Sequence, residues 1–167
     1  NIATCGGCYE EERICAIGET CTVTCSGYNA CYGMTLDATS AAHLDLTCSG
    51  TNACRGMTLR GPSDGPLALT CSGADACYGM TVHAPPAPHN VTVDCGGGGG
   101  STCNGMVVHA EAAAGLRFTC GTTGDSCGLN AKLFCPNCDH DAEGGCVAGA
   151  GSPAAGGGGG GGGDAGF

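Results

Sequence analysis

Cysteine is the residue type in this sequence with the clearest potential for chemistry. Seventeen of the 167 residues are cysteine, a proportion typical of disulfide scaffolds in oxidising compartments. Cysteine side chains can form disulfides or, as thiolates, bind a metal such as zinc. Ten of them occur as pairs that recur along the chain: Cys25 and Cys31, Cys48 and Cys54, Cys71 and Cys77, Cys95 and Cys103, and Cys120 and Cys127.

The spacing of these pairs favours bridges within each repeat. Such a bridge closes a small loop and stabilises the fold by about 2 kcal/mol. A bridge between successive repeats, for example from Cys25 to Cys48, is also within geometric reach. A column of five equivalent cysteines cannot pair completely with itself, whereas five bridges within repeats leave no cysteine over. We therefore expect a disulfide within each repeat.

Seven further cysteines flank the repeats, where a stack of repeats must be capped or joined to a neighbouring molecule. They are Cys5, Cys8, Cys15 and Cys21 before the repeats and Cys135, Cys138 and Cys146 after them. Because seven is odd, one thiol is free, bonded to another molecule, or paired with a residue outside this chain. The odd number of cysteines therefore favours assembly of this protein with another molecule.

The segment "CPNCDHDAEGGC" has the ligand types of a Cys3His zinc site: Cys135, Cys138, His140 and Cys146. In a chain so rich in cysteine, a bridged cap with a surface histidine is favoured over a zinc site. We expect no metal and no cofactor.

The cysteine pairs belong to a longer internal repeat. Their first members are spaced 23, 23, 24 and 25 residues apart, and a period of that length indicates a repeat architecture. A methionine follows each of the first four pairs, and Leu129 takes that place in the fifth; the methionines are Met34, Met57, Met80 and Met106. These residues are expected to fill a narrow core that lacks aromatic side chains.

The segments around each pair alternate in polarity, as in "LDLTC" before it and "MTL" after it. Alternation with period two predicts β-strands, and the intervening segments rich in Gly, Ser and Asn predict corners. One repeat cannot bury its own inward face, so successive coils must stack. The sequence therefore predicts an all-β, disulfide-rich β-solenoid of about five coils over residues 22–134. Residues 1–21 would form a cysteine-rich cap, and residues 135–167 a second cap with a glycine-rich tail.

The outward-facing residues of successive coils indicate whether the surface carries a regular pattern that could bind a regular ligand. One row is nearly all threonine, consisting of Thr24, Thr47, Thr70, Asp94 and Thr119. The neighbouring row reads Thr22, Asp45, Ala68, Thr92 and Arg117, which is not the paired threonine lattice expected of an ice-binding face.

Two further outward rows hold larger side chains. At one corner, Tyr32, Arg55 and Tyr78 are expected to stack, and the same strip could offer a platform for a sugar ring. The position three residues after each methionine holds Asp37, Arg60, His83, His109 and Lys132. This variety is typical of a solvated surface and argues against a histidine-based active site.

The unit "CSG-x-N-A-C-x-G-M", over about residues 21–134, resembles cysteine-rich solenoid repeats of secreted and surface proteins of algae and other protists. The resemblance implies an extracellular, glycosylated β-solenoid, and in some relatives a part in surface filaments or flagellar hairs. Asn90, in "NVT", is a sequon for N-glycosylation.

Charge and composition exclude several functions. The net charge of -10 would repel a nucleic-acid backbone, and no apolar run of about 18 residues predicts a membrane span. The chain begins with Asn1 and carries no leader, which we interpret as a mature secreted chain.

The sequence therefore predicts a structural subunit of an extracellular, glycosylated fibre that assembles with itself end to end. The alternative is a module whose repeated face binds carbohydrate or, less favoured, ice. We expect no enzyme, because an active site on a β-helix needs acidic and basic groups converging in a groove, and the charges here are scattered.

Overall fold

The computed structural model describes residues 2–4, 11–96, 100–121, 131–135, 138–141 and 147–148, of which residues 2–4, 138–141 and 147–148 are described as backbone only. The described residues form strands joined by turns and contain no helix. The all-β prediction is therefore confirmed.

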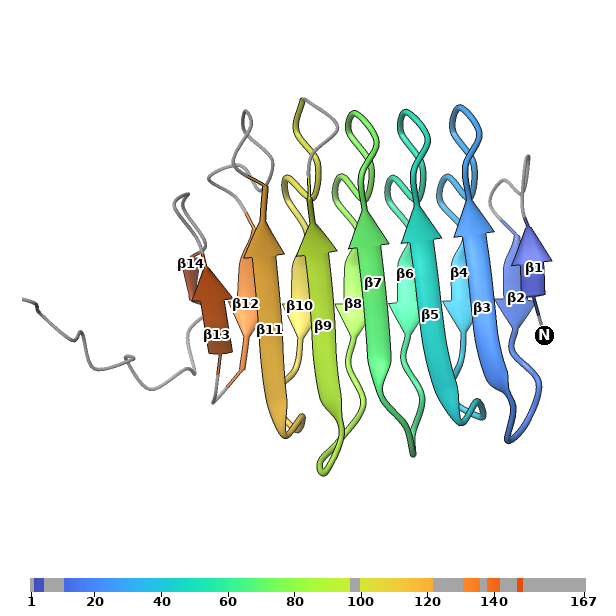
Figure 1. Cartoon of the computed structure of the whole chain (residues 1–167), viewed down its shortest axis with the longest axis vertical. Coiled ribbons are helices and arrows are strands. Elements are labelled where there is room, and N and C mark those ends of the chain that lie inside the picture. The colour runs from blue at the N-terminus through green and yellow to red at the C-terminus, as the bar shows by residue number, and fades with distance from the viewer. Residues whose placement is uncertain are drawn as a thin grey trace, which may run out of the picture.

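Each coil contributes one long strand and one short strand to two separate parallel sheets (Figure 1). The long-strand sheet has the order β1-β3-β5-β7-β9-β11-β13. Its strands are β1 (Ile2–Thr4), β3 (Thr20–Cys25), β5 (His43–Cys48), β7 (Leu67–Cys71), β9 (Asn90–Cys95), β11 (Gly115–Cys120) and β13 (Cys138–Asp141). The short-strand sheet has the order β14-β12-β10-β8-β6-β4-β2. Its strands are β2 (Glu12–Ile14), β4 (Thr35–Asp37), β6 (Thr58–Arg60), β8 (Thr81–His83), β10 (Val107–His109), β12 (Lys132–Phe134) and β14 (Val147–Ala148).

The chain is thus a β-solenoid, as the repeat predicted, but it extends further than residues 22–134. Strands β1 and β2 lie in the predicted N-terminal cap, and β13 and β14 lie in the predicted C-terminal one. All four join the same two sheets in parallel register. The short, weakly apolar segments of these strands explain why the sequence pattern did not mark them.

The core lies between the two sheets and is filled by the inward residues of both. In the long strands burial alternates along the chain, so that Leu44, Leu46 and Cys48 are buried while Asp45 and Thr47 are partly exposed. The four methionines are all fully buried and form the expected row. In the fifth coil, however, the buried residue directly before β12 is Ala131, so the assignment of Leu129 to this row was wrong. Leu129 lies outside the described residues.

The corner after each long strand depends on residues that tolerate a left-handed backbone. In the second coil Asn52, Cys54 and Gly56 have φ of 56°, 55° and 66°, and equivalent residues of neighbouring coils repeat this conformation. Asparagine and glycine adopt it at the lowest cost.

A second column of corner glycines serves a different purpose. A Cβ at Gly73 would overlap the carbonyl group of Gly50, and a Cβ at Gly50 would overlap that of Gly27. The recurring "SG" therefore keeps successive coils in close contact.

The disulfides lie within coils. Four bridges join the pairs that the spacing favoured: Cys25–Cys31, Cys48–Cys54, Cys71–Cys77 and Cys95–Cys103. Cys120 is also disulfide-bonded, but Cys127, its expected partner, lies outside the described residues.

A fifth described bridge joins Cys15 to Cys21. Both are among the cysteines predicted to serve in capping or in contacts between molecules, and this bridge within the chain excludes a disulfide from either of them to another molecule. Cys21 is buried within β3, and Cys15 follows β2, so this bridge closes the turn at the opposite corner of a coil. Cys135 is disulfide-bonded too. The side chains of Cys5, Cys8, Cys138 and Cys146 lie outside the described residues.

Candidate functional site

The most varied chemistry among the described residues lies on the outer face of the short-strand sheet, in the row at the end of each strand. The register aligns one residue from each coil into this row, namely Ile14, Asp37, Arg60, His83, His109 and Phe134. The sequence placed four of these correctly but assigned Lys132 to the fifth coil. Lys132 instead pairs with Val107, because the fifth coil is two residues longer than expected before β12.

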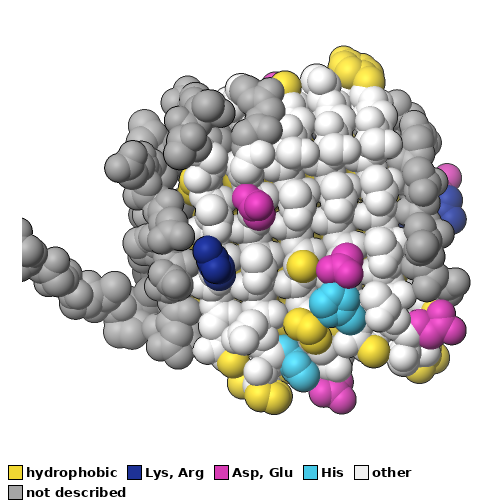
Figure 2. Space-filling model, in the orientation of Figure 1, with side chains coloured by type: hydrophobic (Ala, Val, Ile, Leu, Met, Phe, Trp, Pro, Cys, Tyr) yellow, Lys and Arg dark blue, Asp and Glu magenta, His cyan; other side chains and the backbone are white. Residues whose placement is uncertain are grey.

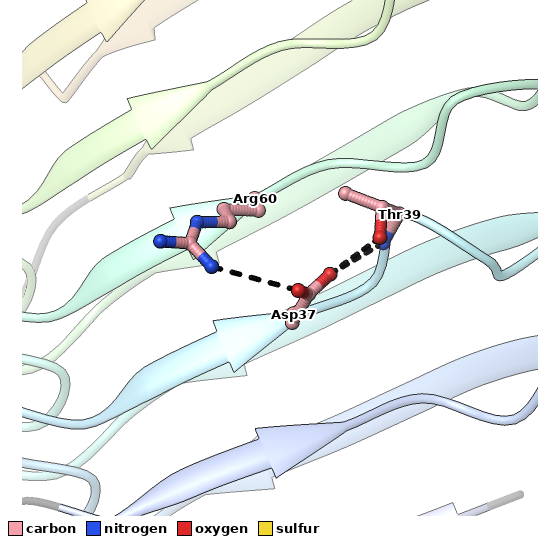
Figure 3. Close-up of polar contacts among 3 residues, drawn as sticks. All are labelled: Asp37, Thr39 and Arg60. Carbon is pink, nitrogen blue, oxygen red and sulfur yellow. Dashed lines mark hydrogen bonds and ion pairs between the residues drawn. The ribbon is translucent and has the colours of Figure 1, made fainter.

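Asp37 and Arg60 form an ordered polar cluster with Thr39 (Figure 3). Oδ1 of Asp37 accepts hydrogen bonds from the Thr39 hydroxyl at 2.6 Å and from its backbone N–H at 3.0 Å. Its Oδ2 lies 3.6 Å from a guanidinium nitrogen of Arg60. The side-chain and backbone hydrogen bonds of Thr39, together with the charge of Arg60, hold the pKa of Asp37 below its usual range. Asp37 is therefore ionised at neutral pH and limits the rotamers of Arg60.

Farther along the row the side chains are rings that stack. His83 and His109 have ring centroids 5.1 Å apart and planes 8° apart, and His109 stacks on Phe134 at 5.0 Å and 4°. Nδ1 of His109 lies 3.2 Å from a carboxylate oxygen of Glu111. Because parallel strands bring identical positions together at about 4.8 Å, a planar side chain in each coil produces such a stack.

A hollow of about 470 Å³ lies beside this row. Arg60 and His83 line it from the strand ends, and the loops that follow β4, β6 and β8 supply Thr39, Gly61, Pro62, Ser63, Ala84 and Pro86. A Cβ at Gly61 would lie 2.8 Å from a Leu67 methyl group and 2.9 Å from the His83 carbonyl oxygen. Gly61 thus allows the two coils to meet at the base of the hollow.

The opposite corner carries the predicted row of Tyr32, Arg55 and Tyr78. The guanidinium carbon of Arg55 lies 4.6 Å from the centroid of the Tyr78 ring, so part of the expected stack is present. Arg55 also donates a hydrogen bond to Asn52 at 3.3 Å, and Asn52 donates one to Asn29 at 3.0 Å. Because Arg55 covers one face of the Tyr78 ring and is tied to the corner, this row acts in packing between coils.

The long-strand sheet presents a broad outer face of small polar side chains (Figure 2). The register confirms that Thr24, Thr47 and Thr70 align, that Asp94 interrupts this row, and that Thr119 follows. It also aligns Thr22, Asp45, Ala68, Thr92 and Arg117. The second row is chemically irregular, so this face lacks the regular lattice that ice recognition would need.

The sulfur atoms of successive coils are also close. Sγ atoms of Cys25, Cys31 and Cys54 lie within 4.8 Å of one another, as do those of Cys71, Cys77 and Cys103. These sulfurs are in disulfides and have no thiolate to offer a metal. Cys135, the first residue of the Cys3His alternative, is likewise disulfide-bonded. The side chains of Cys138, His140 and Cys146 lie outside the described residues.

Asn90, the sequon residue, begins β9 and is exposed, and Thr92 of the same sequon is exposed as well. The intervening Val91 is buried. Both recognition residues of the sequon therefore lie on the outer face of the long-strand sheet, where they are accessible in the folded chain.

The sequence pattern missed the hollow, since Thr39, Pro62, Ser63 and Pro86 lie in loops of different sequence. The one signal available was the concentration of proline in "GPSDGP" and "APPAP", which indicates rigid loops beside the strand ends. Comparisons with protein-family models, with curated proteins and with solved structures find no match to this chain.

Proposed function

We propose that the protein is a structural subunit of an extracellular fibre, in which solenoids stack end to end. The observation that carries this proposal is the in-register stacking of both sheets through the whole described part of the chain. In that part, β1 and β13 of one sheet and β2 and β14 of the other pair on one side only. The backbone groups on their other side can pair with another copy in the same parallel manner.

The disulfides support a mechanical role. Every coil from Cys25 to Cys103 has its own bridge, at a sequence separation of six or eight residues. Bridges of this kind stabilise each coil locally, which suits a subunit that bears load. They are typical of an oxidising, extracellular environment. Among the described residues there is no helix that could cross a membrane.

The cysteine count supports a covalent link between subunits. Seventeen is an odd number, so at least one of these cysteines has no partner among the other sixteen, and twelve of them are already disulfide-bonded. The odd cysteine lies outside those twelve. In the proposed fibre it forms a disulfide with a neighbouring subunit.

The proposal includes N-glycosylation at Asn90, because an exposed sequon in a secreted chain is accessible to the glycosylation machinery. It includes no catalytic role. The ionisable groups of the row of Asp37 to His109 lie along one exposed sheet face rather than around a shared reacting atom.

Electron microscopy of the secreted protein at high concentration tests the assembly, with and without reductant. Ala148 belongs to β14, the outermost described strand of the short-strand sheet, so Ala148→Lys adds a charge to the strand that makes the end contact and should abolish filaments. Ala68→Lys, on the outer face of the central β7, is the matched control and should leave filaments intact. A wild-type protein that stays monomeric, with every thiol accounted for within one chain or by small molecules, contradicts the proposal. Filaments lost in Ala68→Lys and kept in Ala148→Lys would indicate lateral packing and contradict it too.

A further inference from the structure

The hollow beside Arg60 and His83 has the composition of a small-molecule site. It is a shallow hollow that opens to solvent, and its volume of about 470 Å³ is sufficient for one small ligand. Three apolar residues contribute to its wall, Pro62, Ala84 and Pro86. Two hydroxyl groups, of Thr39 and Ser63, and two nitrogen-bearing side chains complete it.

Several hydrogen-bonding groups at the hollow have capacity for a ligand. Arg60 has five N–H donors, and its contact with Asp37 at 3.6 Å is longer than a hydrogen bond. The Thr39 hydroxyl donates to Asp37 and can still accept. His83 makes a ring stack with His109, and no hydrogen bond joins its ring nitrogens to another described residue. Donors, acceptors and hydroxyls thus line the same hollow.

Arg60 is partly preorganised for recognition. Asp37 is itself fixed by both hydrogen bonds of Thr39, and it attracts the guanidinium of Arg60 from 3.6 Å (Figure 3). Pro62 and Pro86 stiffen the loops that follow β6 and β8. A site whose groups are already oriented loses less conformational entropy when a ligand binds.

The charge balance indicates an uncharged ligand. The positive charge of Arg60 is offset by the neighbouring Asp37, and the chain as a whole carries a net charge of -10, which repels polyanions. Polar groups of both kinds beside the exposed ring of Pro86 match the hydroxyls and the C–H face of a sugar. We propose that this hollow binds one residue of a neutral saccharide, with Arg60, His83 and the two hydroxyls as its hydrogen-bonding partners. The site lies within three successive coils, so it is independent of fibre assembly.

A glycan array bearing neutral and acidic oligosaccharides, probed with the monomeric, disulfide-intact chain, tests the site, and calorimetry on the best neutral ligand measures its affinity. We expect neutral oligosaccharides to bind in preference to those that carry uronate or sulfate. Arg60→Met should weaken binding about ten-fold or more, because it removes charge-assisted hydrogen bonds. Ser63→Ala should weaken it less. Arg117→Met makes the same charge change on the opposite sheet and should leave the affinity unchanged.

Circular dichroism verifies that each variant keeps the wild-type β-spectrum and melting temperature. Arg60 and Ser63 are both exposed, so neither substitution removes core packing. Four results would overturn the proposal: no neutral saccharide bound by the wild type, preference for acidic saccharides, full affinity in folded Arg60→Met, or an equal loss in Arg117→Met. Binding that persists in the monomeric Ala148→Lys variant would support the site whatever becomes of the fibre.

Discussion

Removing one disulfide tests whether the bridges stabilise individual coils or merely occupy the core. The bridge Cys48–Cys54 is the best target, since it lies in a central coil and both cysteines are fully buried. Its sequence separation of 6 closes a loop of about seven residues. The chain-entropy relation then gives a stabilisation of about 2.4 kcal/mol at 25 °C. The double variant Cys48→Ala/Cys54→Ala should lose that amount, and also a smaller packing contribution from the two sulfur atoms.

Two further bridges serve as internal comparisons. Cys15–Cys21 has the same separation of 6, so the entropic loss on its removal should be the same, although it lies near one end of the solenoid. Cys95–Cys103 has a separation of 8, which adds only about 0.2 kcal/mol in the same relation. The three double-alanine variants should therefore show nearly equal losses, with the Cys95–Cys103 pair, which closes the longest loop and is fully buried, losing slightly more.

Guanidinium denaturation of each purified variant, followed by circular dichroism, provides the free energy of unfolding. Thr51→Ala, an exposed substitution at the same corner, controls for local changes of sequence. Unchanged stability in Cys48→Ala/Cys54→Ala would refute the view that the bridges hold individual coils. A loss restricted to the terminal pair Cys15–Cys21 would refute it as well, because it would show that stability depends on capping.

Other substitutions test the core, the corners and the surface. Met57→Ala should cost about 2–5 kcal/mol and Met57→Leu less than about 1.5 kcal/mol in thermal or chemical unfolding, because Met57 is fully buried. Gly73→Ala should destabilise by about 1–3 kcal/mol, since its Cβ would overlap the Gly50 carbonyl group. The lowered pKa of Asp37 stabilises the fold above the pKa of the unfolded chain and ceases to do so as pH falls through the folded-state pKa. The stability difference between wild type and Asp37→Asn, measured by unfolding at a series of pH values, should therefore begin to shrink as pH falls below about 4 and disappear only below the lowered folded-state pKa. Asn90→Gln, secreted from a eukaryotic host, should have an intact mass lower by one N-glycan than that of wild type.

The sequence predicted the coil well because the pattern constrains each position in two ways. Period-two alternation determined which residues of a strand such as Leu44 to Cys48 face inward, and the observed burial follows it. The 23-residue spacing determined which residues of successive coils align, and the register of β5 with β7 agrees. Where both signals were strong, side-chain direction and register could be predicted together.

The fifth coil shows where this reasoning fails. In "LNAKLF" the residues Leu129, Ala131 and Leu133 all belong to one face of an alternating strand. A shift by two residues keeps every side chain on its predicted face, so the hydrophobic pattern cannot detect it. The shift nevertheless replaces Lys132 with Phe134 in the outer row, and it creates the stack on His109.

The Cys15–Cys21 bridge could have been found, because its separation of six residues equals that of the central pairs. It was missed because the surrounding "CSGxNAC" motif is absent and the bridge spans the other corner.

The hollow could not have been predicted from the repeat at all. It depends on the relative positions of three loops with unrelated sequences, and no periodicity reports on such an arrangement.

The same contrast separates the two proposals. Properties of the repeated unit, such as its bridge, its methionine and its corner glycines, recur in most of the coils and therefore build length. A specific ligand site needs departures from the repeat, and these departures are concentrated in the row from Asp37 to Phe134 and in the loops beside it. If all coils were identical, each would offer a ligand the same few surface contacts, and no coil would bind it in preference to another. The variation at Arg60 and His83, beside the hollow, is therefore the reason to look for recognition on the short-strand sheet. The unpaired sides of the outermost strands are the reason to look for assembly there.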